Sequence, residues 1–183
     1  MIEGVLQSIA IVLGLIALGG IFAAAEIALI SLRESQVKQI SVKGKRGARV
    51  FKLSKNPNRY LAAVQVGITL CGFLSAALGA EQLGKYVIPE LEGVGISSQY
   101  SEIISIVAIT LVIAYISLVF GELVPKRLAL YKSESIALAT ASTLDFVATI
   151  FRPIIWLLSH STDLILKIFG INSKMQQNQI SEV

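Results

Sequence analysis

Three long stretches of the chain contain no Asp, Glu, Lys or Arg. They run from Gly4 to Ala25, from Tyr60 to Ala80 and from Ile103 to Gly121. A helix needs roughly 20 such residues to cross the ~30 Å hydrocarbon core of a bilayer. The composition agrees, since 15% of the residues are charged, against about 25% in ordinary soluble domains. We therefore predict an all-α membrane protein with three transmembrane helices, and not a soluble domain with three buried helices.

The first stretch shares one feature with a cleaved signal peptide, because the small residues Ala23 to Ala25 follow an apolar core. However, no Lys or Arg precedes that core, whereas Glu3 does. The core is also longer than the roughly 7–15 residues of such a peptide. We expect a first span that is retained.

Lysine and arginine are concentrated between the first and second stretches, where only Glu34 opposes them. These basic residues are Arg33, Lys38, Lys43, Lys45, Arg46, Arg49, Lys52, Lys55 and Arg59. The connection from Glu81 to Glu102 instead carries Lys85 among several glutamates. Because basic loops stay in the cytosol, the pattern predicts an external N-terminus and a cytosolic C-terminus.

The basic first connection also raises the question of nucleic-acid binding. Apart from Phe51 and Tyr60, it lacks the aromatic side chains on which bases stack. Attraction to anionic lipid headgroups accounts for its charge. We expect the lipid bilayer, and no nucleic acid, as its partner.

The segments that flank the spans carry their own signals. Residues 34–55 are predicted to form a basic amphipathic helix that is broken at Gly44 and Gly47. Asn56 followed by Pro57 is typical of a helix N-cap and first position, so the second span should begin there. Residues 93–98 are expected to form an external turn.

Two shorter segments follow the third span. Residues 133–151 and 153–169 each mix apolar and polar side chains, which predicts juxtamembrane amphipathic helices at the cytosolic interface. A fourth span over residues 135–168 is the alternative.

Glu122 lies at the end of the third uncharged stretch. A carboxylate inside a membrane is costly and usually faces a cavity or a partner. Pro125 has no N–H, so the carbonyl of Gly121 loses its helical donor and the helix is expected to kink. Carboxylate and carbonyl oxygens together suit a hard cation such as Mg²⁺. The alternative is that Glu122 pairs with Lys126, one helical turn further along.

Other polar residues of the spans are open to more than one interpretation. Glu26 is expected to reach the headgroups or a basic loop residue in preference to a role in transport. Gln65 and Thr69 share a helix face, where they serve either as neutral ligands or as hydrogen-bonding groups between helices. The motifs of soluble enzymes are absent from the sequence, so we expect no enzyme, and we expect a structural role for His160 near Trp156.

Small residues recur on two spans at spacings that allow helices to approach closely. The first span carries Gly20, Ala24, Ala28 and Ser31, and the second carries Gly72, Ala76 and Ala80. The first face would permit a close crossing with the third span near Glu122.

These segments together resemble the transmembrane domain of the CorC/cyclin M (CNNM) family of Mg²⁺ transporters, whose bacterial members are often labelled haemolysin-C-like. The resemblance covers nearly all of residues 5–170. The motifs that carry it are Ala24–Leu32 (AAEIALISL), Asn56–Leu61 (NPNRYL), Gln65–Leu70 (QVGITL) and Gly121–Leu130 (GELVPKRLAL). The last of these motifs is very specific.

The resemblance implies a transmembrane domain over residues 1–170 that forms a homodimer in the bacterial inner membrane. It also implies that residues 171–183 are a polar linker toward cytosolic CBS modules, which lie outside this chain. Family members are associated with Mg²⁺ export, which is coupled to Na⁺ in some of them. The family's cation site uses a serine late in the first span and the glutamate before the proline, which correspond to Ser31 and Glu122.

The sequence departs from the family at one place. Well-studied members carry asparagines in the middle of the second span, and residues 67–72 of this chain contain none. Thr69, Gln65 or the carbonyl of Gly67 would have to take their place.

The leading hypothesis is therefore a divalent-cation transporter, most simply an exporter of Mg²⁺. The alternative is a non-transporting membrane anchor and dimerisation platform for the CBS modules. A pore-forming haemolysin is disfavoured, because a secreted toxin should not be a stably inserted protein with basic cytosolic loops.

Overall fold

The computed structural model describes residues 2–169, and these residues form helices and no strand. The elements are α1 (Ile2–Ser31), α2 (Glu34–Ser41), α3 (Gly44–Ser54), α4 (Pro57–Gly93), α5 (Ser98–Leu118), the π-helical turn η1 (Val119–Leu123), α6 (Val124–Tyr131), α7 (Ser133–Ile150) and α8 (Arg152–Ile168). The predicted polar linker at 171–183 lies outside the described residues.

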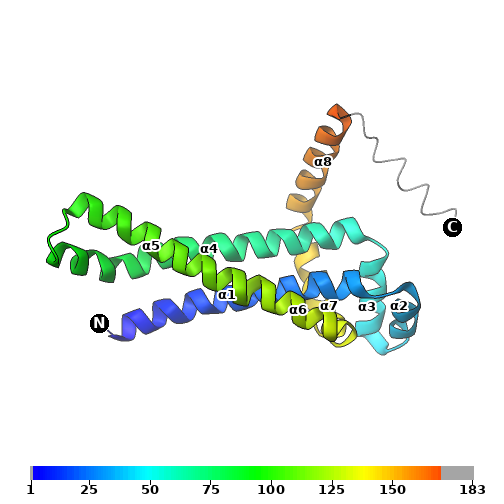
Figure 1. The fold of residues 1–183 in the computed structure, drawn as a ribbon. Coiled ribbons are helices and arrows are strands. Elements are labelled where there is room, and N and C mark those ends of the chain that lie inside the picture. The colour runs from blue at the N-terminus through cyan, green and yellow to red at the C-terminus, as the bar shows by residue number, and fades with distance from the viewer. Residues whose placement is uncertain (1, 170–183) are drawn as a thin grey trace.

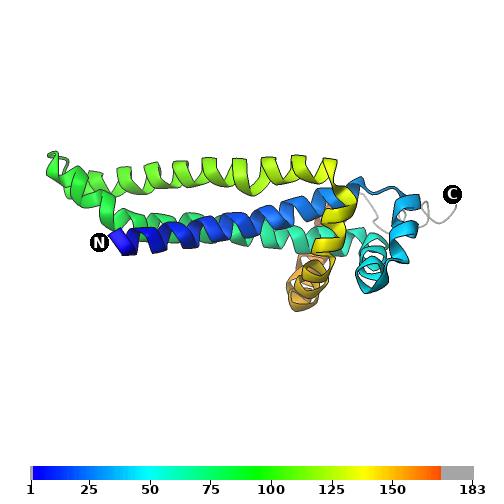
Figure 2. The ribbon, with the colours of Figure 1, turned by 90° about the horizontal axis from the view of Figure 1, so that it is seen from below.

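Three helical stretches are long and apolar enough to cross a membrane. They are Glu3–Ser31, Tyr60–Gly93 and Ser98–Tyr131. They run side by side as a bundle, with α1 and α5 pointing in the same direction along it (Figures 1 and 2). The predicted all-α protein with three spans is confirmed.

The helices α7 and α8 pass the same test of length and composition only as a pair, and they are bent by 76° relative to each other. α8 leaves the bundle, as Figure 1 shows. Among its residues only Ile155 is buried, so nearly all of its apolar surface is exposed. The alternative of a fourth span over 135–168 therefore corresponds to a broken helix and not to a straight one.

The connection between the second and third spans is much shorter than the predicted loop from Glu81 to Glu102. α4 continues to Gly93, and the turn occupies residues 94–97. A helix satisfies its own backbone hydrogen bonds in water as well as in lipid, so the first charged residue does not end it. Gly95 has a φ of 93°, which reverses the chain in this turn.

The basic segment after α1 forms two helices that are separated at Gly44, where φ is 72°. The prediction that Gly47 also breaks the helix is wrong. Gly47 lies inside α3 and is buried against α2, where a Cβ atom would overlap with the carbonyl oxygen of Ile40. The glycine is needed here for a close approach and not for a turn.

The start of α4 agrees with the sequence prediction. Pro57 is the first residue of α4, and the backbone carbonyl of Asn56 accepts a hydrogen bond from the Tyr60 N–H at 3.4 Å. The Asn56 side chain makes no capping hydrogen bond. Proline and the backbone therefore define this helix start without help from the asparagine amide.

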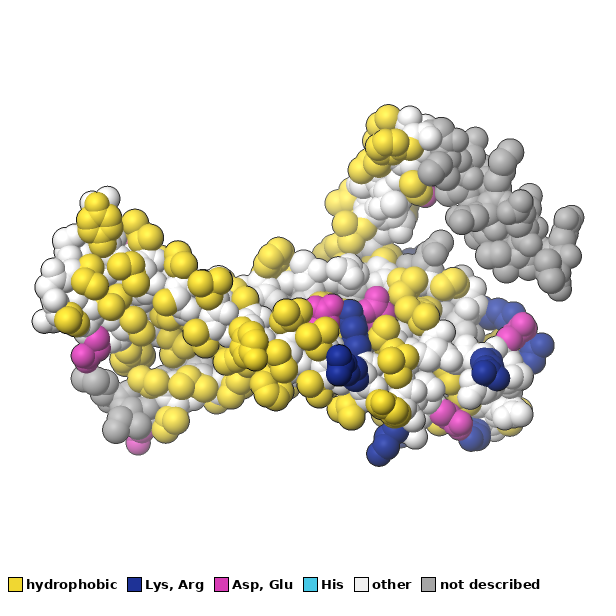
Figure 3. Space-filling model, in the orientation of Figure 1, with side chains coloured by type: hydrophobic (Ala, Val, Ile, Leu, Met, Phe, Trp, Pro, Cys, Tyr) yellow, Lys and Arg dark blue, Asp and Glu magenta, His cyan; other side chains and the backbone are white. Residues whose placement is uncertain are grey.

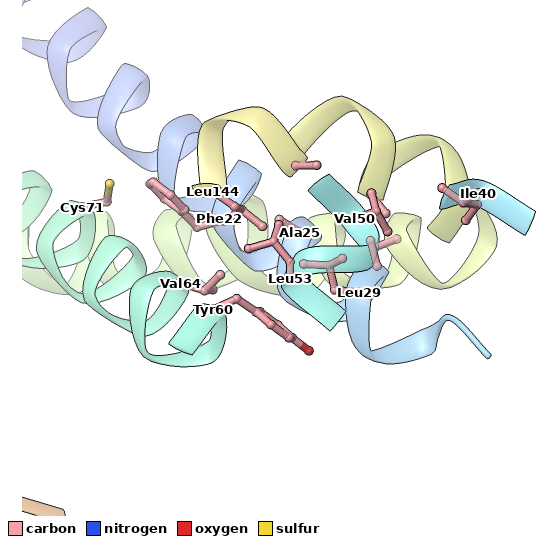
Figure 4. Packing of buried hydrophobic residues seen from close by; sticks show 14 residues of the cluster. Phe22, Ala25, Leu29, Ile40, Val50, Leu53, Tyr60, Val64, Cys71 and Leu144 are labelled. Atoms are coloured by element: carbon pink, nitrogen blue, oxygen red, sulfur yellow. The ribbon is translucent and has the colours of Figure 1, made fainter. Parts of the chain in front are cut away.

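The largest buried cluster joins α1, α2, α3, α4, α6 and α7 (Figure 4). Phe22 and Leu29 of α1 meet Val64 of α4 and Leu144 of α7 in this cluster. α7 is thus amphipathic, as predicted, but it packs on the bundle along its alanine face. The buried residues of that face are Ala137, Ala141, Leu144 and Ala148.

The polar side of α7 is tied to the basic segment. Lys43 pairs with Glu134, and Lys52 pairs with Asp145 at 3.2 Å. Between these pairs, Arg49 Nη1 donates a hydrogen bond of 2.7 Å to the hydroxyl of Ser142. Exposed ion pairs each contribute about 0–1 kcal/mol, so the buried contacts under them carry most of the stability of this junction.

Candidate cation site

The third span contains a π-helical turn immediately before its proline. Pro125 has no N–H to donate to the carbonyl of Gly121, and the backbone responds by widening at Val119–Leu123, where the Val124 N–H bonds to the carbonyl of Val119. The structure has this π-helical turn where the sequence predicted a kink, and α5, η1 and α6 together remain one span (Figure 2). Such π-helical turns are rare and often occur at functional sites.

The π-helical turn packs closely against α1. A Cβ atom on Gly20 would lie 3.0 Å from Pro125 Cγ and 3.1 Å from the carbonyl oxygen of Phe120. A Cβ atom on Gly121 would lie 3.3 Å from the carbonyl oxygen of Ile16. The close crossing predicted from the small residues of the first span is therefore present at Gly20.

Two carboxylates from different spans share one ammonium beside this crossing. Lys126 Nζ lies 2.6 Å from Glu122 Oε1 and 3.5 Å from Glu26 Oε2. We call Glu26 and Glu122 the carboxylate pair. The side chains of Glu26, Lys126 and Glu122 are 20%, 29% and 40% exposed, so the pair is neither buried nor fully open. Figure 3 shows acidic and basic side chains gathered on the otherwise hydrophobic flank of the bundle.

The structure shows the ion-pair partners of Glu122 and Glu26, which the sequence left open. The contact between Glu122 and Lys126, which the sequence offered as the alternative to a cation site, is present. Glu26 pairs with Lys126 of the third span and not with a residue of the basic loop, which was one of its two expected partners. Its expected reach to the headgroups stays a prediction. Sequence reasoning missed this junction, although both acids and the lysine lie near the same end of two spans with the same direction.

Ser31 and Gly121 occupy different places relative to the carboxylate pair. Gly121 is buried and precedes Glu122 in the π-helical turn. Ser31 is the last residue of α1, and its hydroxyl donates to the carbonyl of Ile27. No hydrogen bond joins Ser31 to Glu122 within residues 2–169.

The three candidates on α4 do not face the same way. Gly67 is buried against the ring of Phe22, since a Cβ atom there would lie 2.8 Å from its Cδ2. Gln65 and Thr69 are exposed on the outside of the span. The first residue thus faces α1, whereas the other two are available to lipid or to another chain.

The chemistry of the site is that of oxygen ligands. Within the described part of the chain, no group of three or more His, Cys, Asp or Glu side chains is arranged to hold a metal ion. A cation at the carboxylate pair would complete its shell with carbonyl or hydroxyl oxygens and water. Mg²⁺ commonly binds in this way, through one or two carboxylates and retained water.

His160 is stacked on Trp156, with ring centroids 5.4 Å apart, on the exposed helix α8.

The fold and the site define an all-helical membrane domain with three spans and an ionisable cluster at one interface between them. Residues 10–183 match the family model described as the cyclin M transmembrane N-terminal domain. The chain belongs to this family, and the resemblance found in the sequence is confirmed.

Several relatives match most of the chain. The UPF0053 protein sll0260 of Synechocystis is 41% identical over 161 residues, which cover 87% of this chain and 36% of that protein. The UPF0053 protein YhdP of Bacillus subtilis is 32% identical over 168 residues, which cover 91% of this chain and 38% of that protein. A polyamine export protein of Haemophilus influenzae is 26% identical over 183 residues, which cover 100% of this chain and 42% of that protein. The chain thus spans less than half the length of these relatives.

Proposed function

We propose that this chain is the membrane part of a cation exporter, and that the cation enters at the carboxylate pair. The observation that carries the proposal is the meeting of two carboxylates from separate spans beside a π-helical turn. Ionisable groups in membrane spans are costly and tend to mark ion pathways. A purely structural junction between α1 and η1 would need only the glycine contact at Gly20.

Mg²⁺ is the first candidate for the transported cation. Glu122 supplies a charged oxygen, and Pro125 has no N–H to donate to the Gly121 carbonyl next to it. The Ser31 hydroxyl would contribute after turning away from Ile27, and water would fill the remaining positions. The Gly67 carbonyl, Thr69 and Gln65 stay as further candidate oxygens. Na⁺ is the proposed coupling ion.

A polyamine is the second candidate, and a specific contact favours it. The carboxylate pair already holds a primary ammonium, that of Lys126. The amino groups of a polyamine have the same chemistry. Relatives in Haemophilus influenzae and Salmonella typhimurium carry the name polyamine export protein.

Efflux from proteoliposomes tests this function. We expect the unaltered protein to release Mg²⁺, and Glu122→Gln to lower the rate at least about tenfold, because a charged ligand contributes roughly 1.5–3 kcal/mol. Glu102→Gln, on the same span but exposed at its other end, is the matched control and should leave the rate unchanged. Spermidine-loaded vesicles run in parallel distinguish the two substrates.

The alternative function is a non-transporting anchor and dimerisation platform for CBS modules. It predicts no flux of Mg²⁺ or spermidine above that of protein-free vesicles, and no effect of Glu122→Gln. That result would replace the proposed function with the anchor.

We also propose that the domain spans residues 1–170 of a longer protein in a bacterial inner membrane, with its N-terminus outside and CBS modules in the cytosol. The basic residues of α2 and α3 support this orientation. Cysteines placed at Ser98 and Lys45 should react with an impermeant reagent from opposite sides. Equal labelling of both from outside would contradict the topology.

A homodimer through α4 and α5 is the proposed assembly. Gln65 and Thr69 are polar yet exposed within a span, and Phe73 on the same helix is 72% exposed. Polar groups in spans usually face protein and not lipid. Gly72 has no atom of another residue near its missing Cβ, which leaves room for a second copy. Ala76→Trp should shift the detergent-solubilised protein toward monomer, and an unchanged dimer would remove this face from the interface.

A further inference from the structure

Lys126 occupies the position that the proposed function assigns to a cation. Its ammonium lies between carboxylate oxygens of Glu122 and Glu26, at 2.6 Å and 3.5 Å. The two acids come from different helices, and the tight contact of Gly20 with Pro125 and Phe120 holds these helices together. The junction is therefore arranged to place one positive group between two negative ones.

We propose that Lys126 is a tethered counter-cation, which holds the carboxylate pair when no cation is bound and must leave before the transported cation binds. The inference rests on the proposed function, because it assigns a regulatory role at the same site.

The charges of the site support displacement over joint occupancy. With both carboxylates ionised, the pair carries two negative charges, and Lys126 contributes one positive charge. A dication that joined the pair beside the ammonium would give the cluster a net positive charge, which is unfavourable where the dielectric constant is low. If the ammonium leaves, the dication and the carboxylate pair neutralise each other.

Lys126 is also suited to leave. Its charge sits on a flexible four-carbon stem, and the side chain is 29% exposed. It lies near the end of a span, where long basic side chains can extend toward the headgroups. The exposed residues Arg127 and Lys132 follow it in that direction.

This arrangement has a consequence for selectivity. A single monovalent ion that replaced Lys126 would restore the same charge without the advantage of the tether, so it gains nothing at this site. A dication, or a polyamine with two ammonium groups, returns more positive charge than it displaces. The tethered lysine therefore disfavours the binding of monovalent ions at the carboxylate pair.

Thermal stabilisation by Mg²⁺ in detergent tests the inference, because stabilisation follows the ratio of ligand concentration to dissociation constant. Lys126→Met keeps an unbranched stem and removes the competing charge. The Mg²⁺ midpoint is the Mg²⁺ concentration that gives half of the maximal stabilisation. We expect the midpoint of Lys126→Met to fall about tenfold, which corresponds to ~1.4 kcal/mol. Arg127→Met is the matched control, since Arg127 is the exposed neighbour and forms no ion pair within residues 2–169. Its midpoint should stay at that of the unaltered protein.

The outcomes separate the two claims. A midpoint that is unchanged or raised in Lys126→Met, with normal Mg²⁺ stabilisation of the unaltered protein, overturns the counter-cation and leaves the proposed function standing. An equal fall in Arg127→Met also overturns it, because general local charge then explains the effect. Absence of stabilisation in both the unaltered protein and Lys126→Met overturns both proposals.

A second measurement uses the unaltered protein and so does not depend on the folding of a variant. Lys126 is acetylated with an amine-reactive ester with and without Mg²⁺, and its modification is followed by mass spectrometry relative to Lys132. Displacement predicts faster acetylation of Lys126 when Mg²⁺ is present. A rate that is unchanged or lower with Mg²⁺ contradicts the inference.

Discussion

The two ends of the three-span bundle are built on different principles. On the side of Gly20 toward the start of α1, which we call the apolar end, Val12 and Ile16 of α1 pack with Ile109 and Ile113 of α5. Gly79 of α4 faces this cluster and touches Ile113. None of these contacts involves a charge, and a polar contact between spans on this side is the hydrogen bond of 2.8 Å from the Ser8 hydroxyl of α1 to Gln82 of α4.

The other end, which we call the charged end, surrounds Glu26, Glu122 and Lys126. Here α1 meets the π-helical turn at Gly20, and charged groups lie on the flank beside that contact. Close packing is present at both ends, so it does not account for the charges. The charged groups are therefore an addition to a junction that glycine already makes, which agrees with the proposed cation site.

Gly20→Leu should have the largest effect, because it forces α1 away from Pro125 and Phe120. We expect a loss of about 3 kcal/mol in the free energy of unfolding, the upper range for overpacking, together with the loss of Mg²⁺ stabilisation. Gly14→Leu on the same helix is the control, since nothing lies within 4 Å of its missing Cβ. Thermal unfolding in detergent measures both. Equal effects of the two substitutions would mean that the Gly20 contact does not organise the charged end.

Ile113→Val should lower stability at the apolar end by about 1 kcal/mol, the usual cost of one buried methylene group. Ile113 is 4% exposed, whereas Ile106 on the same helix is 43% exposed, so Ile106→Val should be near neutral. Neither change should move the Mg²⁺ midpoint. A shift of that midpoint in Ile113→Val would show that the two ends are energetically coupled and do not act independently.

Ser31→Ala should have the smallest effect. Its hydroxyl is bonded to the carbonyl of Ile27, and one neutral ligand is readily replaced by water. We expect the Mg²⁺ midpoint to rise by about twofold, which corresponds to about 0.5 kcal/mol, the lower bound for a net hydrogen bond. Glu122→Gln, measured in the same titration, should abolish stabilisation. If Ser31→Ala matches Glu122→Gln, the serine is a principal ligand and the site extends further along α1.

Local patterns were enough to predict the spans and the start of α4. Uncharged runs mark the part of a helix that lies in hydrocarbon, and Pro57 marks a first helical position. The same patterns did not predict the end of α4, because Glu81 and Lys85 follow the uncharged run but lie inside the helix, where they pair at 3.6 Å. The length of an uncharged run indicates how much of a helix the hydrocarbon core can cover, whereas the helix itself can continue beyond that run.

The candidate site was predictable only in part. Pro125 and Glu122 lie close together in the sequence, so a disturbed helix beside a carboxylate could be anticipated. The ion pair of Glu26 with Lys126 joins residues that are a hundred positions apart and depends on which glycines of α1 meet the third span. Gly47 is a similar case, because its role follows from the approach of α2 and not from its neighbours in the chain.

The location of a bound cation tests the carboxylate pair most directly. Mn²⁺ substitutes for Mg²⁺ as a hard cation with oxygen ligands, and anomalous scattering locates it in a crystal of the protein. We predict an Mn²⁺ ion in contact with Glu122, beside Glu26, with the Lys126 ammonium turned away from both. An Mn²⁺ ion bound elsewhere, with Lys126 still between the two carboxylates, would contradict the cation site and the counter-cation together.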